Sequence, residues 1–114
     1  MNKRTSSQDK FYGYLGLATR AGKAVSGEDA VESAARRGRV LLLVIAEDAA
    51  ANTVRKFSSL ARQYRIPVEV VGRKDRLGQA MGKALRAVVG ITDHRFARVI
   101  RESARELVQE NDEE

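Results

Sequence analysis

The sequence contains no cysteine and no tryptophan, and it has one proline, one histidine, three phenylalanines and three tyrosines. The absence of cysteine excludes disulfides and thiolate chemistry, and the single histidine, His94, cannot by itself complete the usual ligand set of zinc. No stretch approaches the ~18 consecutive apolar residues of a membrane-spanning helix, and no apolar signal-peptide segment follows the polar start of the chain. The sequence therefore predicts a cytoplasmic protein with no membrane partner and no metal or other cofactor.

The chain is strongly basic once its last residues are set apart. Lys and Arg total 21 against 15 Asp and Glu, a net charge of +6. Four of the acids lie in the last five residues, so the remainder carries 21 cations against 11 acids, or +10. With 114 residues, 43% of them hydrophobic, the chain suits one domain, predicted at 1–109, followed by an acidic tail at 110–114. Because the cations are spread from Lys3 to Arg105, the charge favours a nucleic acid as partner, with a merely soluble basic surface as the alternative.

An uninterrupted apolar run at 41–45 predicts a strand covered on both faces, in the middle of a sheet. The helix before it is predicted to end at Gly38. Its first turn, 26–29, is expected to project into solvent beside Lys23, where free backbone N–H groups could hold a phosphate or another polar ligand. The apolar stripe of this helix consists of Ala30, Val31, Ala34 and Ala35.

The rest of the chain alternates between helical and extended patterns. A capping-box-like Ser6 and Asp9 predict a first helix at 8–21, and Gly13 and Gly16 within it are expected to allow close packing. Further predicted elements are an extended piece at 23–26, a helix from about 52 that ends before Pro67, a strand at 68–71, a short helix at 76–82, a strand at 88–92 and a last helix capped by Asp93. This alternation predicts an α/β fold, a three-layer α/β/α sandwich with a central mixed sheet of about four strands.

The sequence motifs that could indicate an enzyme are incomplete. Gly16 to Lys23 resembles a phosphate-binding loop, but five residues separate its glycines where four are needed, and Ala24 replaces the metal-holding hydroxyl. The acidic pair Glu47 and Asp48 follows the buried strand without a partner set of acids, bases or metal ligands. We therefore predict a protein that is not an enzyme, and an RNA- or nucleotide-processing site built on this pair and His94 is the alternative.

A basic cluster at 73–86 gives a stronger signal. Leu85, Ala87 and Val88 are interleaved with its cations and offer an apolar surface for bases or sugars, while the cations neutralise phosphates. A solvated charged face is the alternative. The cluster consists of Arg73, Lys74, Arg76, Lys83 and Arg86 around the single carboxylate Asp75, and Lys23, Arg36 and Arg37 are expected to adjoin it.

Several blocks together resemble a family of ribosomal proteins that bind kink-turn RNA, the large-subunit ribosomal protein seven-Ae superfamily, and its YlxQ-type bacterial branch. The blocks are 17–28 (LATRAGKAVSGE), 43–48 (LVIAED), Ile66-Pro67 and 77–82 (LGQAMG), followed by Thr92-Asp93 before the last helix. They occur in the order of the family, and the likeness covers about Phe11 to Leu107. The resemblance implies a compact α/β/α sandwich and a bent RNA helix with sheared G·A pairs as ligand.

The resemblance also implies where RNA is bound. In the family, a Gly-x-Asn-Glu-x-x-Lys pattern contacts the G·A pairs; here Gly27 matches, while Asp29, Ala30 and Ser33 stand at the other three positions. The second family contact maps to the basic and apolar loop at 83–88. The predicted RNA-binding residues are Lys23, Ser26, Gly27, Glu28, Asp29, Ser33, Arg36, Arg37, Lys83, Leu85, Arg86, Ala87 and Val88.

These observations predict a monomeric RNA-binding protein that recognises structured RNA, is associated with ribosomes, and could contact ribosomal proteins. The alternative is a protein-interaction module on the same fold, with weak and non-specific affinity for RNA.

Overall fold

The structure is a computed structural model that describes the backbone of residues 3–112 and the side chains of residues 7–110. Its strands form one four-stranded mixed sheet in the order β1-β4-β2-β3, in which β2 and β3 are parallel and β4 runs antiparallel to both of its neighbours. The elements in chain order are α1 (Lys3–Arg20), β1 (Ala24–Ser26), α2 (Glu28–Arg36), β2 (Leu42–Ile45), α3 (Ala51–Tyr64), β3 (Val68–Val70), α4 (Lys74–Ala80), β4 (Val88–Ile91) and α5 (His94–Asp112).

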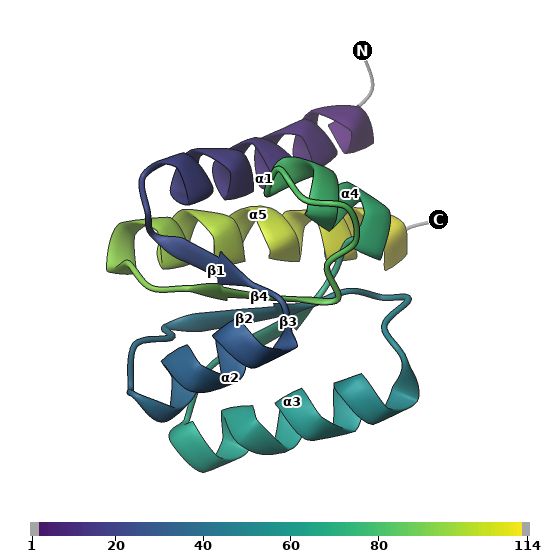
Figure 1. Cartoon of the computed structure of the whole chain (residues 1–114). Coiled ribbons are helices and arrows are strands. Elements are labelled where there is room, and N and C mark those ends of the chain that lie inside the picture. Colours follow the sequence, from purple (N-terminus) through teal and green to yellow (C-terminus); the bar gives the residue numbers. More distant parts are fainter. Residues whose placement is uncertain (1–2, 113–114) are drawn as a thin grey trace.

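Helices cover both faces of the sheet, so the predicted three-layer sandwich is confirmed (Figure 1). On one face, α1, α4 and α5 pack over a core that contains Phe11, Leu15 and Ile100. On the other face, α2 and α3 pack over a second core around Val31 and Phe57. All four residues of β2 are buried, as expected for a strand without polar residues in the middle of the sheet.

Helix ends follow local chemistry that the sequence signals. Gly38 adopts φ 73°, its N–H donates to the carbonyl of Ala35, and the next N–H, that of Arg39, donates to the carbonyl of Ala34. This pair of bonds is the Schellman motif that glycine permits. At the start of α5, Asp93 Oδ2 accepts a hydrogen bond from the Phe96 N–H at 3.0 Å, which confirms the predicted cap and lowers the pKa of this carboxyl.

Some local predictions are wrong. Helix α1 begins at Lys3, so Ser6 lies inside the helix and does not cap it. Gly16 packs against α4 as expected, with its Cβ position 3.4 Å from the carbonyl oxygen of Ala80, whereas Gly13 faces open space. Ala30 is exposed, because the buried stripe of α2 is the narrower set of Val31 and Ala35.

The predicted acidic tail begins within a helix. Helix α5 extends to Asp112, and Glu110 accepts a hydrogen bond from Ser7 Oγ at 2.6 Å, which ties α5 to α1. Glu113 and Glu114 lie outside the described residues. None of the helices in the described part of the chain is long and apolar enough to cross a membrane.

The strand directions give the sheet two different ends. We call the end where β1 and β2 finish and β4 begins the Gly27 end; it carries residues 26–29, 46–48, 71–76 and 83–87. The opposite end, which carries Lys23 and residues 37–41, 65–67 and 92–98, is called the Lys23 end.

Candidate RNA interface

The turn between β1 and α2 and the loop between α4 and β4 form one continuous feature at the Gly27 end. The Gly27 N–H donates to the carbonyl oxygen of Val88 at 3.1 Å, and Arg86 Nε donates to Ser26 Oγ at 3.0 Å. These two segments, about sixty residues apart in sequence, were the two predicted RNA contacts. The tertiary fold therefore brings both into one place.

Gly27 sets the direction of the chain as it enters α2. Its φ of 92° lies in the region that favours glycine, and it is the N-cap of the helix. Since a glycine cap has no side chain to accept a bond from the first turn, backbone N–H groups of α2 stay available to an outside acceptor. The same first turn carries the exposed Glu28 and Asp29.

The loop at 83–88 owes its shape to a glycine in α4. A Cβ on Gly78 would lie 2.1 Å from the carbonyl oxygen of Ala84, so the loop backbone rests directly on the helix. The Lys83 N–H donates to the carbonyl of Gly78 at 2.7 Å, and the Arg86 N–H donates to the carbonyl of Lys74 at 3.0 Å. The missing side chain of Gly78 therefore lets the loop pack closely against α4.

Exposure divides the predicted loop residues into three kinds. Lys83 is exposed, and Leu85 has 57% of its surface exposed, which is unusual for a large apolar side chain. Arg86 and Ala87 are partly exposed. Val88 is fully buried, so it contributes its backbone carbonyl to the Gly27 turn and offers no side-chain surface to a ligand.

The basic cluster at this end is less positive than its sequence suggests. Arg73 pairs with Asp48 at 3.5 Å, and the Arg76 guanidinium lies over the Tyr12 ring at 4.6 Å. Tyr12 is half-buried, and desolvation raises the pKa of its hydroxyl. The sequence placed only Asp75 among the five cations, but folding adds four more carboxylates at this end, namely Glu28, Asp29, Glu47 and Asp48.

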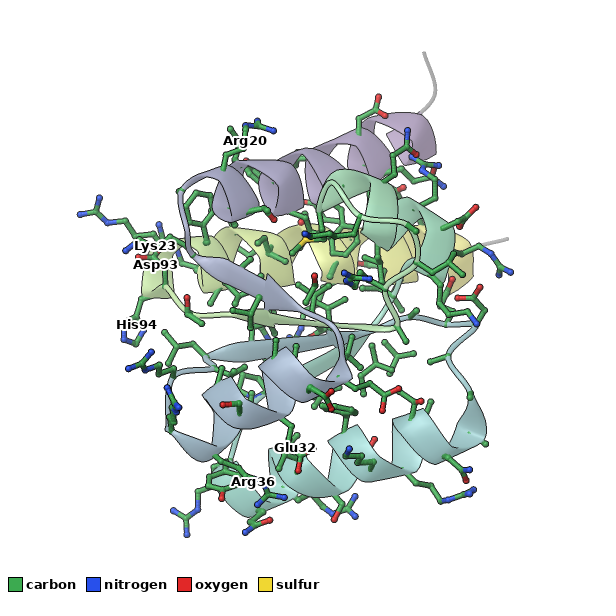
Figure 2. All side chains as sticks on the ribbon, viewed as in Figure 1. Arg20, Lys23, Glu32, Arg36, Asp93 and His94 are labelled. Atoms are coloured by element: carbon green, nitrogen blue, oxygen red, sulfur yellow. The ribbon has the colours of Figure 1, made fainter. Side chains whose placement is uncertain are left out.

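Asp48 has a structural role in the described structure. Its Oδ1 accepts a hydrogen bond from the Lys74 N–H at 2.9 Å, which caps the first turn of α4 and lowers the pKa of the carboxyl. This contact from a distant loop explains why α4 begins at Lys74, two residues earlier than predicted, and nothing in the local sequence signals it. His94 lies at the Lys23 end, so the alternative catalytic set of Glu47, Asp48 and His94 is not assembled (Figure 2).

The expectation that Lys23, Arg36 and Arg37 adjoin the cluster at 73–86 is wrong. Lys23 lies beside Asp93, because its carbonyl accepts the Thr92 N–H at 2.9 Å, at the opposite end of β1 from Gly27 (Figure 2). Arg36 and Arg37 lie at the C-terminal end of α2, about 13 Å along the helix from its first turn. These residues are close to the Gly27 turn in sequence but not in space, because β1 separates Lys23 from the turn and α2 separates Arg36 and Arg37 from it.

Asp29 and Ser33, the first and last of the three altered positions of the family pattern, are exposed on α2, as Ala30 is. Ser33 and Asp29 line a shallow depression on α2 together with Glu32, Arg36 and Arg37. Glu32 in this depression pairs with Arg36 at 2.8 Å and with Lys56 of α3 at 2.9 Å. These ion pairs lower the pKa of Glu32, and the charge of Arg36 is partly neutralised by its carboxylate partner. Among the described residues, no group of His, Cys, Asp and Glu is arranged to hold a metal ion.

The molecule is thus a small α/β/α domain that presents a helix N-terminus and a basic, apolar loop together at one end of a mixed sheet. The chain belongs to the ribosomal protein L7Ae/L30e/S12e/Gadd45 family, whose model matches residues 9–101.

Two relatives with similar sequences agree with this assignment. The chain is 41% identical to the RNA-binding protein YlxQ of Bacillus subtilis (strain 168) over 88 residues, which are 77% of this chain and 88% of the relative. It is 31% identical to the RNA-binding protein YlxQ of Enterococcus faecium over 96 residues, covering 84% and 92% of the two chains.

Solved structures show the same fold. A protein of unknown function from Bacillus halodurans C superposes with a TM-score of 0.80 at 38% identity, over 84% of this chain and 97% of the other. The Giardia lamblia 15.5kD RNA binding protein superposes with a TM-score of 0.73 over 96% and 98% of the two chains; at 18% identity, this likeness shows the fold alone.

Proposed function

We propose that this protein binds structured RNA at the Gly27 end of its sheet, recognises a bent helix of the kink-turn class, and acts as a monomer associated with ribosomes. The observation that carries the proposal is the direct connection of the Gly27 turn to the loop at 83–88 through the Gly27–Val88 and Arg86–Ser26 hydrogen bonds. A site held this way needs little reorganisation on binding. The names of the YlxQ relatives support RNA as the ligand.

Each part of the site has a distinct task in this proposal. The free N–H groups at the start of α2 and the ammonium of Lys83 bind phosphates. Leu85 supplies an exposed apolar surface for a sugar or an unstacked base. Arg86 is held by Ser26 and by the carbonyl of Leu85 at 2.8 Å, so it fixes the loop and presents its remaining N–H groups outward.

The altered α2 positions direct the proposal toward recognition of shape. Asp29 accepts hydrogen bonds but cannot donate one, Ala30 does neither, and Ser33 carries no charge. An RNA bend exposes base edges and a distorted backbone that a regular A-form helix hides. We therefore expect a preference for bent RNA that depends mainly on the backbone path and less on the identity of the G·A pairs.

The primary test compares a kink-turn RNA with a matched duplex lacking the kink, over a series of salt concentrations. A preference for the kink that persists at about 0.15 M salt supports the proposal, because non-specific phosphate binding falls steeply with salt. Equal affinities with equal salt slopes would contradict kink recognition.

The site itself is tested by charge reversal. We call the Gly27 turn and the loop at 83–88 together the slot. Lys83→Glu with Arg86→Glu is expected to weaken binding of the kink-turn RNA at least about tenfold, because two attractive charges become repulsive there. The matched control is Lys10→Glu with Arg55→Glu, which changes the net charge equally on exposed helix positions outside the slot. Equal losses in the two double variants would remove the slot from the proposal. Circular dichroism melting checks that both variants fold, and cosedimentation with ribosomes tests the cellular assignment.

A further inference from the structure

The Lys23 end of the sheet carries a second basic surface. Six exposed cations come from four different segments that converge there: Lys23, Arg37, Arg39, Arg65, Arg95 and Arg98. Within residues 7–110, none of these six side chains forms an ion pair. We name these six residues the Lys23 surface.

Backbone contacts hold these segments in register. The carbonyl of Lys23 accepts the Thr92 N–H at 2.9 Å, and the Leu41 N–H donates to the carbonyl of Ile91 at 2.7 Å. The segments that precede β1 and β2 are thereby attached to the end of β4 and to the residues that lead into α5. Figure 2 shows Lys23, Asp93 and His94 together at this end.

A groove runs across the same surface. Leu41 and Pro67 line it, together with the charged α5 side chains Arg98, Arg101, Glu102 and Arg105. Leu41 and Pro67 also line a neighbouring hollow that contains Arg65. Arg98 of α5 and Arg65 at the end of α3 therefore border two neighbouring hollows that share the apolar residues Leu41 and Pro67.

The charge of the folded protein is divided unequally between the two ends. At the Gly27 end, the five cations of the cluster at 73–86 share the surface with five carboxylates. At the Lys23 end, the six cations lie near two carboxylates: Asp93, which caps α5 through the Phe96 N–H, and Glu102, which lines the groove beside Arg98. The Lys23 end is therefore the more positive of the two, and it lies away from the Gly27 turn and the loop at 83–88.

We propose that the Lys23 surface binds the phosphate backbone of a second RNA segment, so that one molecule holds two stretches of RNA at opposite ends of its sheet. Five of the six cations are arginines, whose planar guanidinium groups bind phosphate oxygens in pairs. The surface offers fixed positive charge with no base-reading geometry, and so it recognises RNA independently of sequence.

Other features favour RNA over an anionic membrane. The large apolar side chains that the described structure exposes are Leu17, Val70 and Leu85, and none of them belongs to the loops of the Lys23 surface. A surface without exposed large apolar groups has nothing to insert between lipids. The backbones at Lys23 and Gly27 are about 13 Å apart along β1, so the two ends can contact adjacent segments of one folded RNA.

The test uses the double variant Arg39→Gln with Arg95→Gln and the control Lys10→Gln with Arg55→Gln, which loses the same charge. Binding is measured for the kink-turn RNA and for the plain duplex, each with long flanking helices, over a salt series. The Lys23-surface variant is expected to lose at least about tenfold in affinity for both RNAs and to lower the salt slope by about two, one unit per phosphate contact. The control should change less than about twofold.

The outcomes separate this inference from the proposed slot, on which it does not depend. A loss in the Lys23-surface variant equal to that of the control overturns the second surface. A wild-type protein without kink preference, combined with the expected loss on the duplex, overturns the slot and supports the Lys23 surface. Vesicles containing anionic phospholipid form a further arm; weakened vesicle binding with RNA affinity equal to the control would assign the surface to lipid and overturn the proposal.

Discussion

Two glycines in helices show how differently one residue type can act in this fold. Gly13 in α1 is exposed, and a Cβ there would meet no atom within 4 Å. Gly78 in α4 is buried, and its Cβ position lies 2.1 Å from the Ala84 carbonyl oxygen. One glycine is only a flexible position in a helix, whereas the other determines where the loop at 83–88 can lie.

Alanine substitutions at these two positions should therefore change stability in opposite directions. Gly78→Ala should lower the free energy of unfolding by about 3 kcal/mol, because the loop backbone must move. Gly13→Ala should raise it by about 0.5–1 kcal/mol through helix propensity alone. Urea denaturation of both variants measures the difference, and a neutral Gly78→Ala would show that the loop does not rest on α4.

Asp93 provides a pH-dependent contribution to stability. The hydrogen bond from the Phe96 N–H holds the pKa of the folded carboxyl below its ordinary value. The contribution is therefore present above the pKa of the unfolded state and is lost as pH falls through the folded pKa.

We expect Asp93→Ala to melt below the wild type at pH 7, with the gap closing in strong acid. Asp93→Asn retains a cap and should lose less. Thermal melts of the three proteins between pH 2 and pH 7 check this. A gap between wild type and Asp93→Ala that stays constant with pH would contradict the charged cap.

Among the described elements, β3 lies at an edge of the sheet, where it pairs with β2. Glu69 interrupts the otherwise apolar strand predicted at 68–71, which suggests an edge position or a side chain that faces outward. The edge position is correct, but the side chain has only 11% of its surface exposed and accepts hydrogen bonds from Arg101 and Arg105, both at 3.3 Å. Two arginines of α5 thus fasten the edge strand to the helix layer.

Loss of the hydrogen bonds from Arg101 and Arg105 to Glu69 should increase local opening of β3 before it affects the rest of the sheet. Glu69→Gln is expected to lower the free energy of unfolding by about 1 kcal/mol, a modest amount since Arg101 is partly exposed and Arg105 is largely exposed, so that solvent screens both. Amide hydrogen exchange in β3 should accelerate more than exchange in β2, which is paired on both sides. Equal acceleration in the two strands would indicate global destabilisation instead of a local effect.

For the whole molecule, the separation of charge between the two sheet ends has the largest consequence for function. A net charge of +6 steers the protein toward RNA at long range. The Lys23 surface would dominate that attraction, while the Gly27 end, with its mixed charges, would select the shape of the RNA at contact. The double variants at the two ends measure these contributions separately.

Sequence patterns were sufficient for the architecture. The apolar run at 41–45, the helical stripes and the stops at Gly38 and Pro67 arise from backbone sterics and hydrophobic burial, which act over a few residues. For this reason the central strand and the layers were predicted correctly. The first turn of α4 was predicted incorrectly because its cap, Asp48, lies 26 residues away in the chain.

By itself, then, the sequence determined the fold class, the order of the elements, the basic character of the chain, and the two segments proposed to bind RNA. Only the tertiary structure decided that the Gly27 turn and the loop at 83–88 meet, that carboxylates share their end, and that Lys23, Arg36 and Arg37 lie elsewhere. The physical reason is the direction of the strands and of α2. Each carries the chain from one end to the other, so the end at which a charge lies depends on topology and not on its distance along the sequence.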